Sequence, residues 1–161
     1  ADHLAVELEL RELKFSGDLS NETIRIGFTS DRDRPKVAAS VVLSRNFNGD
    51  VLIQGEAPGG GTVVPVTTIS RNNELDQPII LRLEIDTNKG TYRILSKNVG
   101  DILSKNAGDS NFQNHGAGKI ASSRPARFLR LSVKGNFTDN DEVAKIESIQ
   151  VNWKSGENRS K

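Results

Sequence analysis

Apolar and polar residues alternate along several stretches of this chain, and this period-two pattern constrains the fold more than any other feature. Residues 4–10 carry leucine or valine at every second position, and two of the residues between them are glutamates. Successive side chains of a β-strand point to opposite faces of a sheet, so this segment predicts a strand with one buried face. Leu13 and Phe15 resume the pattern one residue out of phase, which predicts a β-bulge at Arg11 and Glu12.

Similar short segments, separated by turn residues, continue to the end of the chain. They predict further strands around 24–28, 37–43, 51–53, 64–66, 79–85, 92–96, 129–133 and 149–153. No window shows the sustained spacing of an amphipathic helix. The prediction is therefore an all-β fold, an antiparallel β-sandwich.

The length of 161 residues fits one domain, and we expect 1–161 to form a single β-sandwich. Its core is predicted at about 4–153 and a polar tail at 154–161. Residues 97–124 lack alternation and contain a short duplication, in which Ser96 to Asp101 recurs as Ser104 to Asp109. We expect this stretch to be an irregular loop insertion.

The segment 78–94 is the clearest single unit. Apolar residues at every second position from Ile79 to Ile85 lead into Thr-Asn-Lys-Gly at 87–90, which predicts a tight turn with Gly90 at positive φ. This hairpin resembles one found in concanavalin A-like jelly-roll domains, a superfamily that includes laminin-G-like modules and several polysaccharide lyases and hydrolases. The resemblance implies a jelly-roll sandwich in which the first strand pairs with the last one, at 149–153. It leaves function open, because one sandwich fold serves lectins, binding modules and enzymes.

Composition excludes several chemistries. The chain has no cysteine, which removes thiolate catalysis, iron–sulfur clusters and cysteine-ligated zinc. Its two histidines, His3 and His115, are too few for a multi-histidine metal site. Its net charge of +1 argues against a nucleic-acid partner, and no apolar run is long enough for a membrane span.

The compartment is predicted from weaker features. The chain begins at Ala1, contains no methionine and carries three Asn-X-Ser/Thr triplets, at Asn21, Asn136 and Asn158. The start at Ala1 and the absence of methionine indicate that a signal peptide or tag has been removed, or that this is a domain excised from a larger multidomain protein. The polar, Asn-rich composition and the missing methionine favour an extracellular or secreted setting, and in a eukaryotic secreted protein the triplets would be glycosylation acceptors. The triplets are also common by chance in a chain rich in Asn, Ser and Thr.

Arginines occupy the non-core phase of four predicted strands. Arg25, Arg82, Arg93 and Arg130 each lie between two apolar residues, so we expect all four to point outward. A guanidinium group offers a planar fork that suits carboxylates and sulfates, and we predict these arginines, together with Tyr92, as ligand-binding residues. The open alternative is a solvated face on which the arginines form ion pairs with acidic residues of the protein, namely Glu22, Glu84 or Asp86.

Few aromatic residues are available to stack on sugar rings. Besides six phenylalanines the chain has only Trp153 and Tyr92, and both lie in the predicted core phase of their strands. Neutral crystalline glycans, which favour rows of exposed aromatic side chains, are therefore a poor match. A soluble, acidic or hydroxyl-rich glycan read by polar side chains fits better.

Calcium is the one metal for which the sequence offers ligands. Loop residues supply hard oxygen ligands, from Asp31 and Asp33 in one loop and from Asp139, Asn140, Asp141 and Glu142 in an acidic loop at 138–142. The loop does not match the twelve-residue calcium pattern, and such loops are often solvated turns. We predict at most a structural calcium site there and no other cofactor.

The function predicted from these features is a non-catalytic, extracellular carbohydrate-binding module for an acidic or sulfated glycan. One alternative is a polysaccharide lyase of the same fold, with Arg82 or Arg93 as charge neutraliser and His115 and Tyr92 as base and acid. The catalytic strand motifs of the enzymes in the resembling superfamily are missing, which weighs against it. A second alternative is a structural or assembly subunit built from a sandwich.

Overall fold

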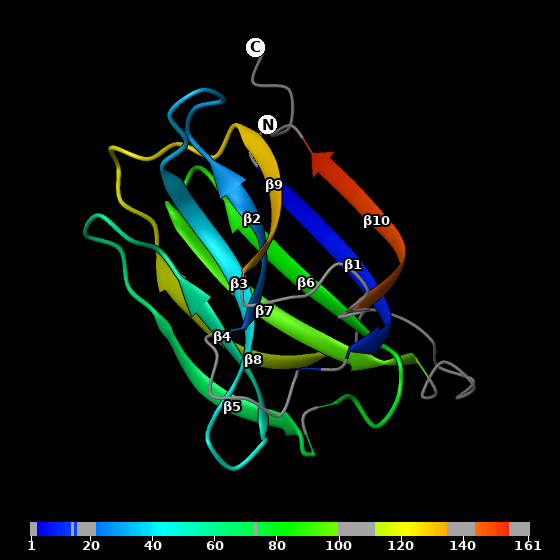
Figure 1. Ribbon diagram of the computed structural model, residues 1–161. Helices are drawn as coiled ribbons and strands as arrows, with labels where there is room; N and C mark the ends of the chain where they lie inside the picture. The colour runs from blue at the N-terminus through cyan, green and yellow to red at the C-terminus, as the bar shows by residue number, and fades with distance from the viewer. Residues whose placement is uncertain are drawn as a thin grey trace.

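The computed structural model describes residues 3–13, 15, 22–72, 74–99, 112–134 and 144–154, which hold ten β-strands and no α-helix (Figure 1). No helix in these ranges is therefore long and apolar enough to cross a membrane. The strands are β1 His3–Leu13, β2 Thr23–Thr29, β3 Val37–Arg45, β4 Val51–Glu56, β5 Val64–Ser70, β6 Ile79–Asp86, β7 Thr91–Asn98, β8 Gln113–Lys119, β9 Phe128–Lys134 and β10 Ala144–Lys154.

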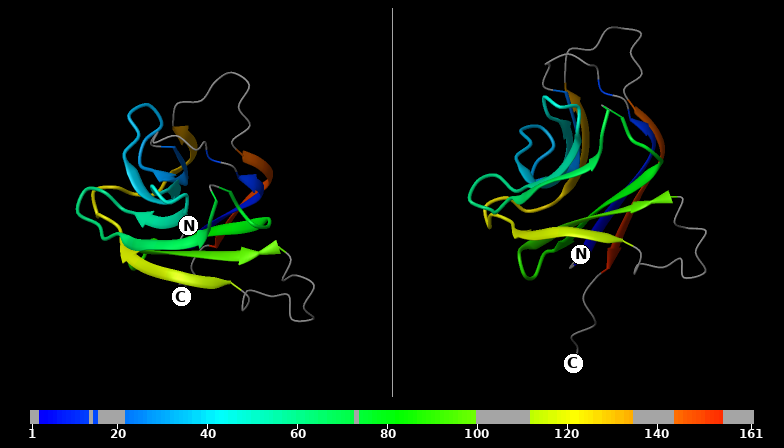
Figure 2. Two further views of the ribbon diagram at one scale, coloured as in Figure 1. Left: turned by 60° about the horizontal axis from the view of Figure 1, so that its bottom comes forward. Right: turned by 90° about the horizontal axis from the view of Figure 1, so that it is seen from below.

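The strands form two antiparallel five-stranded sheets packed face to face. Sheet I has the order β10-β1-β6-β7-β8, and sheet II has the order β5-β4-β3-β2-β9. Strand β1 pairs with β10 in sheet I, while β2 pairs with β9 in sheet II, so the two ends of the chain are nested as in a jelly roll. The predicted fold class and the predicted pairing of first and last strands are confirmed. Figure 2 shows the two layers, which adjoin along β5 and β8.

The predicted bulge in β1 is confirmed. The register of β1 against β10 shifts between Glu9 and Leu10 and again between Leu10 and Glu12. The shift lets Leu13 and Phe15 enter the core beside the earlier leucines of the strand, and both are almost fully buried. The extra residue thus keeps one face of an eleven-residue strand apolar throughout.

The predicted hairpin is also confirmed, as β6 and β7. Gly90 has φ +63°, a conformation that glycine adopts without steric cost. The carboxylate of Asp86 fixes the turn by accepting hydrogen bonds from the backbone N–H groups of Asn88, at 3.1 Å, and Lys89, at 3.0 Å.

The core lies between the sheets and is built from the apolar phase of the central strands. Tyr92 is its largest ring, 2% exposed, and its hydroxyl donates to the backbone carbonyl of Thr62 at 2.6 Å. The ring passes between two glycines: a Cβ at Gly55 would lie 2.8 Å from Tyr92 Cε2, and one at Gly118 would lie 2.7 Å from Tyr92 Cε1. The two strands that flank the ring can approach it only because both positions lack a side chain.

The loop insertion predicted at 97–124 is wrong in part. Strand β7 continues to Asn98, and Gln113–Lys119 forms β8, one of the two edge strands of sheet I. This segment contains Asn, His and Gly rather than alternating apolar residues, so it has no sequence pattern of a strand. It is held by backbone pairing with β7, which does not depend on side chains. The second copy of the duplication, 104–109, lies outside the described residues.

The prediction that Trp153 belongs to the core is wrong. Trp153 lies opposite Leu4 in the register, in the inward phase, yet it is 69% exposed. Val133 of β9 lies opposite buried Ile24 and is 50% exposed. Strands β9 and β10 are edge strands of their sheets. Among the described residues, no side chain covers Trp153 or Val133 enough to bury it, whereas Leu131 of β9 packs against the core.

Candidate functional site

The four predicted arginines lie on the outer faces of the sandwich, in two pairs. Arg82 of β6 and Arg93 of β7 belong to sheet I, whereas Arg25 of β2 and Arg130 of β9 belong to sheet II. The structure therefore brings together the members of each pair and separates the two pairs by the thickness of the molecule. No single ligand face contains all four.

On sheet I the arginines belong to a chain of ion pairs that crosses three strands. Arg82 Nη1 lies 2.8 Å from Glu7 Oε1, and Arg82 Nε lies 2.8 Å from Glu84 Oε1. Glu84 is directly opposite Arg93 in the register, and its second oxygen accepts a hydrogen bond from Arg93 Nε. The internal pairing through Glu84, which the sequence left open, is what the structure shows. The row Glu7–Arg82–Glu84–Arg93 alternates in charge and is balanced.

The two arginines of this row differ in accessibility. Arg82 is mostly buried, and its guanidinium carbon lies 5.6 Å from the centre of the Phe112 ring, which also has the Lys97 amine at 5.3 Å. Arg93 is half exposed. Arg82 thus holds the row in place, while Arg93 presents unused N–H donors to the outside.

Beside this row lies a depression of about 450 Å³ that crosses all five strands of sheet I. Its outward-phase lining includes two small residues, Ala5 of β1 and Ala117 of β8, each next to a long side chain on the neighbouring strand. The depression exists because these alanines leave space between longer neighbours. The polar side chains in the outward phase around them are His3, Arg82, Glu84, Asp86, Thr91, Arg93, Asn152 and Lys154.

Both signs of charge face this depression. The hydrogen bond from the Lys89 backbone N–H lowers the pKa of Asp86, and the nearby His3 ring acts in the same direction, so the Asp86 carboxyl is ionised at neutral pH. His3 Nδ1 lies 3.9 Å from Asp86 Oδ2. Carboxylate acceptors and guanidinium, amide and ammonium donors are therefore presented side by side.

Tyr92 takes the core position that the sequence also allowed. It lies beneath the depression, but its ring and hydroxyl face the core, and burial raises its pKa to about 12. Its phenol is therefore neutral and already donates to Thr62. We leave Tyr92 out of the binding site on this ground.

His115 lies on the inward side of β8. Its Nε2 lies 2.6 Å from the Ser96 hydroxyl, and Ser96 pairs with Leu81, a core residue. Burial lowers the pKa of His115. Because the hydroxyl of Tyr92 also points inward, the candidate acid and base of a lyase do not share a space with Arg82 and Arg93, and the lyase alternative gains no support.

Sequence reasoning missed several residues around the depression. Asn152 lies in the outward phase of β10, opposite Ala5, and the expected pairing of first and last strands could have placed it there. Phe112, which packs against Arg82 and does not line the depression, had no usable signal, because it precedes a strand that the pattern did not reveal.

The predicted calcium ligands Asp139, Asp141 and Glu142 lie outside the described residues, as do the asparagines of the three Asn-X-Ser/Thr triplets. Within the part of the chain that the structure describes, no group of three or more His, Asp or Glu side chains could hold a metal ion. The calcium site stays a prediction.

Fold and site together define an all-β sandwich of jelly-roll type with a polar depression on the outer face of one sheet. No protein-family model matches the chain, and no curated protein matches it. Among solved structures it is similar to sheep galectin-11 in complex with glycerol, at 12% identity and a TM-score of 0.42, over 94% of this chain and 90% of the other. It is also similar to an alginate lyase from Pseudomonas aeruginosa, at 14% identity and a TM-score of 0.39, over 83% of this chain and 65% of the other. The likeness is one of layout and is too weak to transfer a ligand, an activity or a site residue.

Proposed function

We propose that this protein is a non-catalytic carbohydrate-binding domain and that the depression on the outer face of sheet I holds the sugar. The observation that carries the proposal is the depression itself: about 450 Å³ of open space over Ala5 and Ala117, bordered by Arg93, Asp86 and Asn152. This volume lies in the usual range of small-molecule sites, roughly 300–1,000 Å³.

A sugar hydroxyl both donates and accepts hydrogen bonds, so it matches a surface that offers both functions at short intervals. Arg93 and Asn152 supply donors, and Glu84 and Asp86 supply carboxylate acceptors. The ion pair between Arg93 and Glu84 and the turn contacts of Asp86 hold these three side chains in place before a ligand arrives. Such preorganisation reduces the ordering cost of binding.

The charge balance of the depression favours a neutral, hydroxyl-rich glycan there. Arg82 and Arg93 already face Glu7 and Glu84, so a sugar carboxylate would meet the acidic side chains of Glu84 and Asp86 as well as the arginines. An acidic or sulfated glycan, expected from the arginines, is better matched by the outer face of sheet II, where Arg25 and Arg130 lie. The extracellular location that the sequence favours suits a glycan-binding domain and stays a prediction.

A glycan array followed by calorimetric titration tests the proposal. Ala117→Phe should fill the depression while keeping a residue that strands favour, and it should abolish binding. Arg93→Ala should weaken binding roughly tenfold or more, the loss of about one charge-assisted hydrogen bond.

Val66→Phe is the matched control, because Val66 lies exposed on β5, an edge strand of the other sheet. It should bind as the wild type does. Absence of binding to every glycan of the array at millimolar concentration would overturn the proposal. Release of unsaturated uronate products from an acidic polysaccharide would instead favour the lyase alternative.

A further inference from the structure

A second, smaller depression lies on the outer face of sheet II. It has a volume of about 130 Å³, against about 30 Å³ for one molecule of liquid water. We call it the sheet II pocket; its polar lining consists of Arg25, Thr29, Ser40, Arg130 and Ser132, and it also includes Gly27.

Ser40 is a buried polar residue without a partner. It lies on the central strand β3, it is 1% exposed, and its hydroxyl has no hydrogen-bond partner in the described part of the chain. It belongs to the outward phase, because its neighbours Ala39 and Val41 pack in the core. Buried hydroxyls are nearly always hydrogen-bonded, so an unpaired one that lines a pocket points to a group that binds there.

Gly27 makes room for such a group. It lies opposite Ser40 in the register, and a Cβ at this position would come within 2.5 Å of Ser40 Cβ. With glycine here, the floor of the pocket is backbone and the Ser40 hydroxyl rather than a covering side chain.

Two arginines flank the pocket from adjacent strands. Arg25 pairs in register with Ser132, and Arg130 pairs with Gly27. Arg25 directs Nε and Nη2 to one oxygen of Glu56, at 3.1 and 3.0 Å, and keeps further N–H donors. Arg130 is exposed and makes no ion pair among the residues that the structure describes. Two guanidinium groups beside one carboxylate leave this pocket with a net positive charge.

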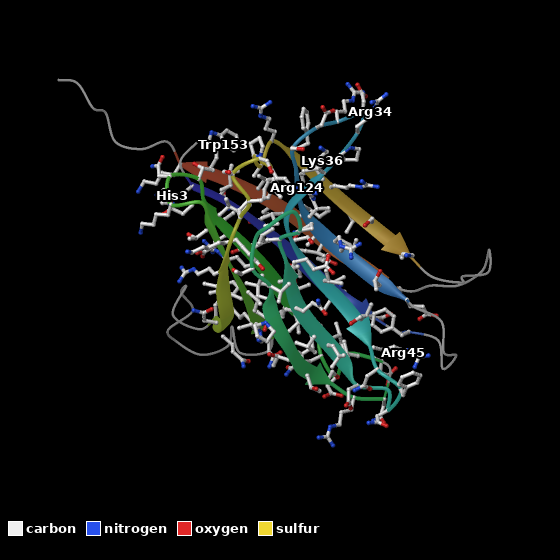
Figure 3. All side chains as sticks on the ribbon, turned by 90° about the vertical axis from the view of Figure 1, so that its left-hand side faces the viewer. His3, Arg34, Lys36, Arg45, Arg124 and Trp153 are labelled. Atoms are coloured by element: carbon white, nitrogen blue, oxygen red, sulfur yellow. The ribbon has the colours of Figure 1, made fainter. Side chains whose placement is uncertain are left out.

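Further cations lie at the same end of the sheet. Arg124 Nη1 donates to the backbone carbonyl of Val37, a residue of the pocket wall, at 3.3 Å. Lys36 precedes Val37, and Figure 3 labels Lys36, Arg34 and Arg124 at the same end of the molecule. These side chains extend the positive charge from the pocket toward the loops at the end of the sheet.

We propose that the sheet II pocket binds an oxyanion, the sulfate ester or carboxylate of an acidic polysaccharide. The Ser40 hydroxyl donates to the anion from the floor, and Arg130 and Arg25 contact it from the sides with their planar N–H forks. Lys36, Arg34 and Arg124 then lie along the path of the polymer on one side of the bound group, at the end of the sheet next to Val37. This site is separate from the sugar site of sheet I and adds a second ligand class.

The test begins with the smallest probes. The full chain is titrated with sodium sulfate and with sodium acetate, each against sodium chloride at equal ionic strength, and followed by amide NMR of Gly27, Ser40 and Ser132. Sulfate or acetate should shift these amides and chloride should not. A sulfated oligosaccharide should bind at least tenfold more tightly than its desulfated counterpart, because several cations act on one chain.

Variants distinguish binding in the sheet II pocket from a general attraction of anions to positive charge on the protein. Ser40→Ala should raise the melting temperature without anion, since it removes an unpaired buried hydroxyl, and it should lose the sulfate-induced shifts. Arg130→Gln should leave the melting temperature unchanged and weaken the sulfated ligand roughly tenfold. Arg71→Gln makes an equal charge change at an exposed residue that is remote in the strand order. It should change neither the melting temperature nor the affinity for the sulfated ligand.

Three results would overturn the proposal. The first is an unchanged sulfate response in Ser40→Ala. The second is an equal loss of affinity in Arg71→Gln and Arg130→Gln, which would indicate diffuse charge only. The third is tighter binding of a single-stranded DNA oligonucleotide than of the sulfated ligand at the same salt concentration. Ala117→Phe, which blocks the sheet I site, should keep sulfate binding, so the two proposals can fail independently.

Discussion

At the scale of single residues, the hydroxyl of Tyr92 is the polar end of a ring that is otherwise enclosed in the core. Tyr92→Phe should lower the free energy of unfolding by about 1 kcal/mol, because it removes the hydrogen bond to the Thr62 carbonyl while keeping the ring. Urea unfolding at neutral pH measures the difference. Equal stability of the two proteins would show that this hydrogen bond contributes nothing.

The same substitution has a consequence at alkaline pH. The pKa of Tyr92 is about 12 in the folded protein, while the unfolded chain carries a phenol of ordinary pKa near 10. The contribution of the Tyr92 phenol to the free energy of unfolding is complete below about pH 10. It is lost as the pH rises from about 10 to 12, because over this range the phenol ionises in the unfolded chain and stays neutral in the folded protein. The stability difference between wild type and Tyr92→Phe should therefore shrink over this range.

His115 gives a pH effect on the acid side. Burial lowers its pKa in the folded protein, so below about pH 6.5 the unfolded chain binds a proton that the folded protein does not. The contribution of neutral His115 to the free energy of unfolding should be complete above about pH 6.5 and should decrease as the pH falls below that value.

The variant His115→Gln should lack this decrease in stability between about pH 7 and pH 5. Its altered contact with Ser96 should change the stability by the same amount at every pH. Thermal melts at several pH values measure it. Asn114→Gln on the same strand is the control and should keep the slope of the wild type. An identical slope in His115→Gln would contradict the assignment.

At the scale of strands, the row Glu7–Arg82–Glu84–Arg93 ties β1, β6 and β7 together. Arg82→Ala should destabilise the protein by about 1–3 kcal/mol, because it leaves two mostly buried carboxylates facing one another. Arg93→Ala should cost less than about 1 kcal/mol, since that side chain is half exposed. Equilibrium unfolding of both variants tests the ranking.

A double variant distinguishes charge from packing. Glu7→Gln combined with Arg82→Ala should recover part of the stability lost in Arg82→Ala alone, because it removes the negative charge of Glu7, which has lost its ion pair with Arg82, whereas Glu84 keeps its ion pair with Arg93. If the double variant is less stable by the sum of the single effects, the row contributes through packing against Phe112 rather than through charge.

The strands that alternation predicts are those with one face in the core. Residues 79–85 and the bulged β1 could be predicted because burial of one face of a strand requires an apolar residue at every second position. Strand β8 could not, because it is an edge held by backbone pairing to β7 and its composition is polar. The exposure of Trp153 could not be predicted either, since phase alone does not tell whether a strand of the other sheet lies over a side chain.

In the candidate sites, too, some features follow from the local sequence and others depend on the order of the strands. The outward direction of Arg25, Arg82, Arg93 and Arg130 follows from strand phase, and sequence predicts it. Their separation into two pairs follows from strand order, which brings Glu7 to Arg82 across 75 residues of sequence. Whether the Ser40 hydroxyl finds a hydrogen-bond partner depends on the residues opposite it on the neighbouring strands β2 and β4, and the local sequence around Ser40 does not predict those residues.

At the scale of the whole molecule, the two proposed sites differ in charge and lie on opposite outer faces. Raising the salt concentration from about 0.1 M to about 1 M shortens the Debye length from about 10 Å to about 3 Å. The affinity for a sulfated ligand should then fall tenfold or more, while the affinity for a neutral glycan on sheet I should change less than twofold. Calorimetry at the two salt concentrations tests this, and equal salt dependence of both ligands would contradict the assignment of one charged and one neutral site.

The ring of Tyr92 between two glycines restricts how this chain can change during evolution. A side chain at Gly55 would meet Tyr92 and Val64, both of which can be replaced by smaller residues, so position 55 can vary once those two have changed. A side chain at Gly118 would also lie 2.5 Å from the backbone oxygen of Thr62, which no substitution removes. Among diverging descendants of this sequence, position 118 should therefore stay glycine, while positions 55, 64 and 92 should change together.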